Sequence, residues 1–167
     1  GGSTYGEGTT LIENFAFETA GLNGYDAFIY CNEQNGNTRY PDNVTIKNCT
    51  FDGQGLNSYA VNLHKTNNIV IENVTAKNYG YGFLQLPSSN ISLSVKDVNI
   101  SNVNYGLKID YSNGVTLENV TTTNVKNYGI YDSNYGTKTY TVTNCNFSSI
   151  EIWERDGKVS VSTFNFI

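Results

Sequence analysis

The chain has 167 residues, a length that suits one domain with a sizeable hydrophobic core. Only 15% of the residues are charged, and no apolar run approaches the roughly 18 residues that a membrane-spanning helix needs. The net charge of −5 lacks the basic footprint of a general nucleic-acid binder. We therefore expect neither a nucleic-acid partner nor insertion into a membrane.

The N-terminal stretch differs in composition from the rest of the chain. Residues 1–8 contain four glycines, and we interpret them as a flexible Gly-rich leader or a cloning remnant. Residues 9–167 then form a single domain. Its last residues still follow the sequence pattern of the interior, so we expect flanking domains in a longer natural chain. Three cysteines, an odd number, do not make a disulfide framework.

An eight-residue segment recurs seven times along the chain, with a mean spacing near 25 residues. Apolar residues alternate within each copy and then shift phase at the fifth position, which predicts two short strands joined by a tight turn. Asparagine suits such a turn because it tolerates left-handed backbone. The fifth positions are Asn14, Asn48, Asn73, Asp97, Asn119, Asn144 and Thr163.

A Tyr-Gly segment follows most copies about a dozen residues later and predicts a third strand. It is clearest at 59–63, 81–83, 105–109 and 128–130, and residues 25–28 fit it more loosely. Three short strands in each repeat of about 25 residues indicate a parallel β-solenoid, in which every repeat stacks on the next.

The repeats resemble the right-handed parallel β-helix of the pectin-lyase-like group, including its NosD-like repeat regions. The segment that starts at Asn68 and the Tyr-Gly segments carry this resemblance, which covers residues 9–167. It implies an all-β, right-handed, single-stranded parallel β-helix of about seven rungs, with three short strands per rung and an Asn ladder at one turn. It also implies an extracellular or cell-surface location, although the fold itself carries many different activities.

The ladder asparagines are expected to turn inward and to bond to one another along the stack. Glycosylation sequons at Asn43, Asn48, Asn73 and Asn119 are then by-products of the repeat. Cys49 and Cys145 fall four repeats apart in one interior column, too far for a disulfide, and are expected to be core thiols.

The outer face of the Tyr-Gly strands is the candidate binding site. Small residues at 27, 60, 82, 106 and 129 predict a shallow trough along the axis, beside aromatic and charged side chains. In the alternative interpretation, the glycines only let a neighbouring loop pack closely. The candidate substrate-binding residues are Asn62, His64, Lys108, Asp110, Tyr131 and Trp153, with Tyr131 and Trp153 expected one rung apart as an aromatic platform.

Three residues near this face are candidates for catalysis. Lys108, Asp110 and Arg155 suit a polysaccharide lyase or glycoside hydrolase, although the paired-Asp and Arg-Ile-Lys motifs of the related polygalacturonases are absent from the sequence. Asp132 lies near Asp110 in the repeat, but its phase points it inward or into a turn. With a single histidine we expect no metal site and no cofactor, and Ca²⁺ only if the chain is a lyase.

The sequence leaves three functions open. The first is an extracellular or cell-surface module that binds polysaccharide or acts as a spacer within a larger protein. The second is a small polysaccharide lyase or glycoside hydrolase that uses the outer face of the Tyr-Gly strands. The third is a structural segment of an adhesin or fibre.

Overall fold

The structure is a computed structural model that describes residues 8–18, 27–31, 42–87, 90–110, 112–133, 138–154, 157–161 and 164–166. All the regular elements in these ranges are strands. They are β1 (Thr9–Glu13), β2 (Ala16–Glu18), β3 (Ile29–Cys31), β4 (Asn43–Leu56), β5 (Tyr59–Leu63), β6 (Asn68–Leu86), β7 (Asn90–Ile109), β8 (Ser112–Asp132), β9 (Thr139–Thr143), β10 (Cys145–Phe147), β11 (Ile150–Glu154), β12 (Gly157–Val161) and β13 (Phe164–Phe166).

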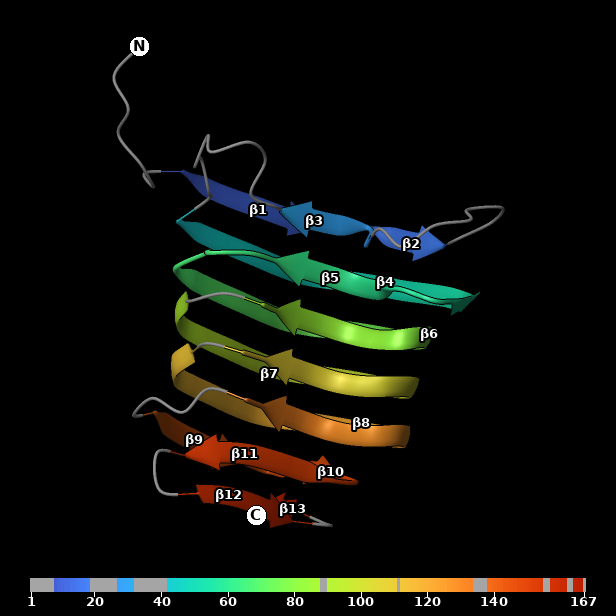
Figure 1. Cartoon of the computed structure of the whole chain (residues 1–167). Helices are drawn as coiled ribbons and strands as arrows, with labels where there is room; N and C mark the ends of the chain where they lie inside the picture. Colours follow the sequence, from blue (N-terminus) through green and yellow to red (C-terminus); the bar gives the residue numbers. More distant parts are fainter. Residues whose placement is uncertain are drawn as a thin grey trace.

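The chain winds into a parallel β-solenoid, as the repeat predicts. Strands β1, β4, β6, β7, β8 and β9 pair in parallel order at equivalent positions of successive turns. Figure 1 shows these layers stacked from blue to red along one axis. Four turns are complete, namely β4 with β5, β6, β7 and β8, and shorter strands form a partial turn at each end. The sequence therefore predicted the fold class correctly but overestimated the number of rungs.

An asparagine ladder makes one corner of the solenoid. The backbone is left-handed at six equivalent positions, with φ between 50° and 64° at Asn14, Asn48, Asn73, Asp97, Asn119 and Asn144. The amide of Asn73 donates to Asn48 Oδ1 at 2.9 Å, and that of Asn144 donates to Asn119 Oδ1 at 2.7 Å. The predicted bonding along the stack is thus confirmed. The predicted inward orientation is wrong, because these side chains lie at the surface of the corner.

The ladder has a direction, since each amide nitrogen donates to the residue one turn nearer the N-terminus. Asn119 donates to Asp97 Oδ1 at 2.8 Å. The carboxyl side chain of Asp97 has no N–H group, so it cannot donate to Asn73 and continue the ladder. The ladder therefore consists of two runs that meet at Asp97.

A second ladder, which the sequence analysis missed, turns the next corner. Asn78, Asn102 and Asn124 also have left-handed backbone, with φ of 64°, 54° and 51°. Each lies five residues after a residue of the first ladder, and this regular spacing is the sequence signal that identifies it. The bonds run from Asn124 to Asn102 at 2.7 Å and from Asn102 to Asn78 at 3.0 Å. Asn78 then donates to Asp52 Oδ1 at 2.9 Å. Asp52 is the last residue of this ladder, so its side chain only has to accept a bond.

The interior is a set of aliphatic columns. The fully buried Ile46, Ile71, Val95 and Leu117 occupy one column, in register from β4 to β8. Cys49 and Cys145 are buried free thiols, as expected. Phe15 lies opposite Cys49 in the outermost described layer and is 57% exposed.

Small and large residues alternate at the corner where the second strand of each turn meets the third. One core column contains Phe51, Ala76, Ile100, Thr122 and Phe147, and the facing column contains Ala60, Phe83, Gly106, Gly129 and Ser149. In four of these five pairs a large residue in one column is matched by a small residue in the other, and the exception is Thr122 with Gly129. The rings of Phe51 and Phe83, one turn apart, lie 5.9 Å from each other.

The predicted trough is therefore wrong. Gly106 and Gly129 face the core, where an added Cβ at Gly129 would lie 2.8 Å from Thr122 Oγ1 and 3.1 Å from Phe147. Gly82 is shifted into another column, opposite Tyr59 and Tyr105, and the Tyr59 ring covers it. The glycines make room for core side chains of neighbouring strands and leave no groove.

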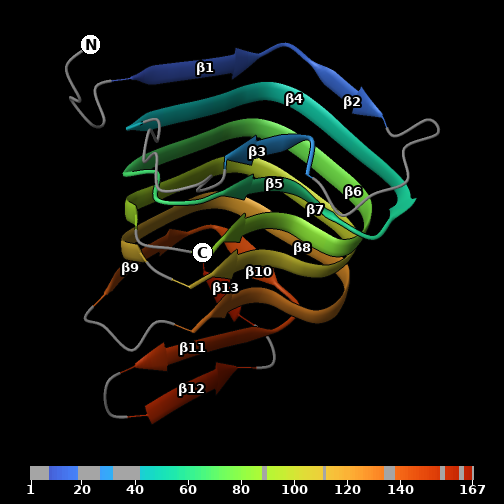
Figure 2. The same cartoon turned by 45° about the horizontal axis from the view of Figure 1, so that its top comes forward.

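The C-terminal strands reverse direction. β12 pairs antiparallel with β11, and β13 pairs antiparallel with β10 (Figure 2). The strands β12 and β13, which fall in the predicted seventh parallel repeat, instead run back along the last turn. Antiparallel β12 and β13 occupy strand edges that another parallel layer would otherwise need. The chain therefore covers this end of the sheet with its own backbone.

Replacing Asn73 with alanine should lower the free energy of unfolding by about 1–2 kcal/mol, because alanine loses the ladder bonds and is strained at positive φ. Asn73→Gly relieves the backbone strain but also loses the bonds, so it should fall between the wild type and Asn73→Ala. Urea denaturation followed by circular dichroism measures both. Equal stability of all three proteins would contradict this account of the corner.

The Gly106→Ala variant should be destabilised by about 1–3 kcal/mol, because the added methyl group would clash with the Gly129 carbonyl oxygen in a close-packed core. Gly8→Ala is the control, since nothing lies within 4 Å of a Cβ at Gly8. Thermal melting distinguishes the two variants. If Gly106 lined an open trough, both substitutions would be silent.

Candidate functional site

The outer face of the third strands carries most of the side chains that the sequence analysis selected. It is formed by β3, β5, the last parts of β6, β7 and β8, and β11, which lie nearest the viewer in Figure 1. Strand pairing defines its central outward column, which reads Tyr30, Asn62, Gln85, Lys108, Tyr131 and Glu151. We call this surface the tyrosine face.

Three tyrosines form its aromatic centre. The ring of Tyr131 lies 5.8 Å from that of Tyr105 and 5.6 Å from that of Tyr128, and the latter two rings are 6.3 Å apart. Lys108 Nζ lies over the Tyr105 ring, 5.7 Å from its centroid. A cation over an aromatic face is attracted by the ring quadrupole, so Lys108 and the tyrosines form one cluster.

Further tyrosines extend this surface along the axis. Tyr59 and Tyr81 have ring centroids 6.0 Å apart, and Tyr81 is 39% exposed. Tyr30, 44% exposed, meets the His64 ring edge to face at 6.4 Å. Aromatic side chains therefore recur on this face from β3 to β8.

Two of the predicted binding residues, His64 and Asp110, form hydrogen bonds at the ends of these strands. His64 N donates to Cys31 O at 3.0 Å. Asp110 lies two turns from His64 by register and accepts a 2.7 Å bond from the Ser133 hydroxyl. Asp110 is thus held by Ser133, and no ion pair joins it to Lys108 in the described structure. Arg155, the third catalytic candidate, lies outside the described residues.

The expected platform of Tyr131 and Trp153 does not form. Tyr131 is in register with Glu151, which places Trp153 diagonally across the same face. The indole of Trp153 donates to Glu151 Oε1 at 2.8 Å. The prediction failed because it assigned Trp153 to the column of Tyr131, two residues out of register, and it missed Tyr105 and Tyr128. The repeated Tyr-Gly pairs were the available signal, but they were used only to locate the strand.

Asp132 points into the core, as its phase predicts. Its side chain is fully buried beside Lys138 and Tyr140, so it contributes no carboxylate to the tyrosine face. Within the described ranges no three His, Cys, Asp or Glu side chains gather as a metal site would require.

Burial and neighbouring negative groups favour the neutral form of Tyr59. Desolvation raises the pKa of Tyr59 well above its ordinary value of 10.0, and Tyr105, Asp110 and Tyr81 raise it further. The pKa values of Tyr79 and Tyr140 are also raised, in both cases mainly by burial. These three hydroxyls remain protonated at neutral pH.

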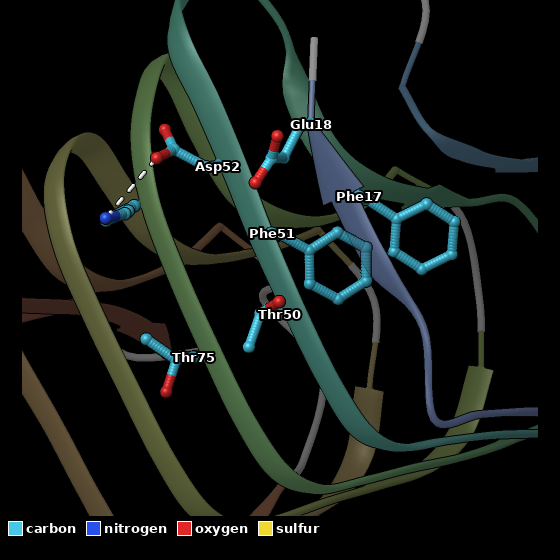
Figure 3. Close-up of a pocket in the computed structure, with 7 residues that line it drawn as sticks. Phe17, Glu18, Thr50, Phe51, Asp52 and Thr75 are labelled. Carbon is cyan, nitrogen blue, oxygen red and sulfur yellow. Dashed lines mark ion pairs between the residues drawn. The ribbon is translucent and has the colours of Figure 1, made fainter.

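A pocket of about 270 Å³ lies on a different face, at the end of β2 (Figure 3). It is lined by Phe17, Glu18, Thr50, Phe51, Asp52, Thr75 and Lys77. Asp52 is occupied by bonds from Asn78 and the Gln54 N–H and by an ion pair with Lys77 at 3.3 Å. These bonds, the Asn78 side chain first, lower the pKa of Asp52. The pocket is smaller than most ligand sites and was not foreseen from the sequence.

The sequence matches the family model described as the right handed beta helix region over residues 2–147. The chain belongs to this right-handed β-helix family. No curated protein matches it, and neither does any solved structure. The described part of this β-helix contains no helix with the length and apolar character of a membrane span. Family membership establishes the architecture and leaves the activity to be argued from the site.

The stability of the protein should fall in alkaline solution above about pH 10. In the unfolded chain Tyr59, Tyr79 and Tyr140 lose their protons near the ordinary pKa, whereas the native state retains them. Stability is therefore full below that pH and is lost as the pH rises toward the native pKa values. Melting temperatures measured from about pH 8 to about pH 11, together with tyrosinate absorbance, test this.

The variant Tyr59→Phe removes one of the three groups, and its melting temperature should fall less steeply with pH than that of the wild type. Identical slopes would show that Tyr59 titrates normally in the native state.

Proposed function

We propose that the protein is an extracellular or cell-surface β-helix module that binds an extended polysaccharide along its tyrosine face. The observation that carries this proposal is the cluster of Tyr105, Tyr128 and Tyr131, in line with Lys108 on an outward column of the solenoid.

The chemistry of the face suits a sugar chain. Tyrosine offers a large and rigid apolar surface with a polar tip, so it can pack against the C–H face of a sugar and bond to its hydroxyls. Asn62 and Gln85 continue the column of Lys108, where Gln85 supplies an amide donor and acceptor and Asn62 an amide donor. Successive strands are about 4.8 Å apart, close to the length of one hexose unit, so a linear glycan would meet similar groups in each turn.

Cleavage of the polymer is the second candidate, and it rests on the same surface. Lys108 and Asp110 lie two residues apart on neighbouring outward positions, where a base and an acid would be needed. Asp110 is bonded to Ser133, and the other carboxylate of this face, Glu151, is buried and accepts a bond from the Trp153 indole. Binding without cleavage therefore explains the arrangement better.

The proposal is tested by affinity electrophoresis on pectin, alginate and glycosaminoglycan gels. Retardation by one of these polymers is expected, and Tyr131→Ala should weaken binding roughly tenfold, the effect of losing one central aromatic contact. Trp153 is the only tryptophan and lies diagonally across from Tyr131, so its fluorescence should change on binding.

Two controls sharpen the test. Thr75→Ala alters an exposed residue of β6 that lies in register with Thr50 and Asn99, away from the tyrosine face, and should bind as the wild type does. Reducing ends and absorbance of unsaturated products, measured with and without Ca²⁺, detect cleavage and would favour the enzyme. Failure of every polymer to retard the protein or to change the fluorescence would refute binding at this face.

A further inference from the structure

A buried lysine and a buried aspartate meet at the C-terminal end of the core. Lys138 Nζ lies 2.6 Å from Asp132 Oδ1, and the two side chains are 2% and 0% exposed. Lys138 also donates to the Trp153 carbonyl oxygen at 2.7 Å, and the Tyr140 hydroxyl donates to Asp132 Oδ2 at 2.6 Å. The amine, both carboxyl oxygens and a phenol are thus fixed in one cluster. This cluster plays no part in the proposed glycan site.

The column that contains Asp132 is otherwise aliphatic. In register, Asp132 lies between Ile109 on β7 and Ile152 on β11, in a column that is aliphatic in the preceding turns. Removing two opposite charges from water costs several kcal/mol per ion, and an apolar site favours their neutral forms. A condensation of such a pair begins with the transfer of one proton from the amine to the carboxylate, which gives a neutral amine beside a neutral carboxylic acid.

We propose that Lys138 and Asp132 condense spontaneously to an isopeptide bond. The lone pair of neutral Nζ attacks Cγ of the protonated carboxyl group, and a bond forms between them. The bond from Cγ to Oδ1 breaks, and Oδ1 leaves as water with two protons that both came from the Lys138 ammonium group. The product is a neutral amide that keeps one N–H, so atoms and charge balance without any oxidant, cofactor or other reactant.

The geometry suits this reaction. A carbon–oxygen bond is about 1.2 Å long, so Nζ lies within about 4 Å of Cγ, close to a reactive separation. Tyr140 faces the other oxygen, Oδ2, where negative charge develops as the amine adds. Burial and the Asp132 carboxylate both raise the pKa of Tyr140, which keeps the hydroxyl as a donor. Condensation also removes a buried ion pair from the core.

Mass spectrometry of the full chain tests the proposal. The intact protein, folded and then denatured, should be lighter than its sequence by one water molecule. Trypsin cleaves after lysine and arginine, but it should not cleave after a Lys138 whose amine is acylated. Digestion should therefore yield a fragment of residues 127–155 that lacks one water, in place of fragments 127–138 and 139–155.

Three variants separate the cross-link from other losses of water. Lys138→Arg should retain the full mass and be cleaved after position 138. Asp132→Asn should expel ammonia instead of water and give the same cross-linked fragment. Tyr140→Phe should form the bond about tenfold more slowly, because it lacks the donor at Oδ2. Dehydration at Asp156 beside Gly157 would leave cleavage at Lys138 intact.

The wild-type result alone can overturn the proposal. Full sequence mass and complete cleavage after Lys138, in protein that remained folded for several days at neutral pH, would show that the pair stays ionic. Glycan binding at the tyrosine face does not depend on this result, because none of its residues takes part in the reaction.

Discussion

Each turn of this chain must end directly above its starting point, one strand spacing further along the axis. Its backbone must also be in register with the turn before. Left-handed asparagines at two corners make that return, and their amides fix the spacing by donating to the preceding turn. Once the register is set, each residue shares a column with its equivalents. The aliphatic core and the tyrosine face are both consequences of this stacking.

The alternation of apolar residues was enough to predict the first two strands of each turn, their inward side and the first ladder. The third strand was harder, because two consecutive residues such as Phe83 and Leu84 both face the core at its corner. A strict alternation therefore assigned Gly106 and its equivalents to the wrong side. Their position depends on the size of Thr122, Phe147 and other residues of a different strand, which local sequence does not reveal.

The two consecutive inward residues at this corner shift the alternation by one residue. This shift also explains which residues of the candidate site were predicted correctly and which were not. Asn62, Lys108 and Tyr131 were assigned correctly to the outward column. Each of them comes after the corner at which the alternation shifts by one residue. Trp153 was misplaced because the last turn has a different spacing between its strands. The reversal of β12 and β13 was also hidden, since parallel and antiparallel strands share the same alternation. Periodicity specifies which way a side chain faces and leaves strand direction open.

The ladders also bear on how the protein ages chemically. An asparagine deamidates when the backbone nitrogen of the next residue attacks its side-chain amide, and a small, mobile next residue speeds this attack. Here the next residues are bulky and tied into strands, for example Val74 after Asn73 and Val120 after Asn119. The Val120 nitrogen donates to Cys145 Sγ at 3.4 Å, so its attack on the Asn119 amide is slow. A protein with 25 asparagines can therefore keep its corners intact, and the sheet protects the amides that hold it in register.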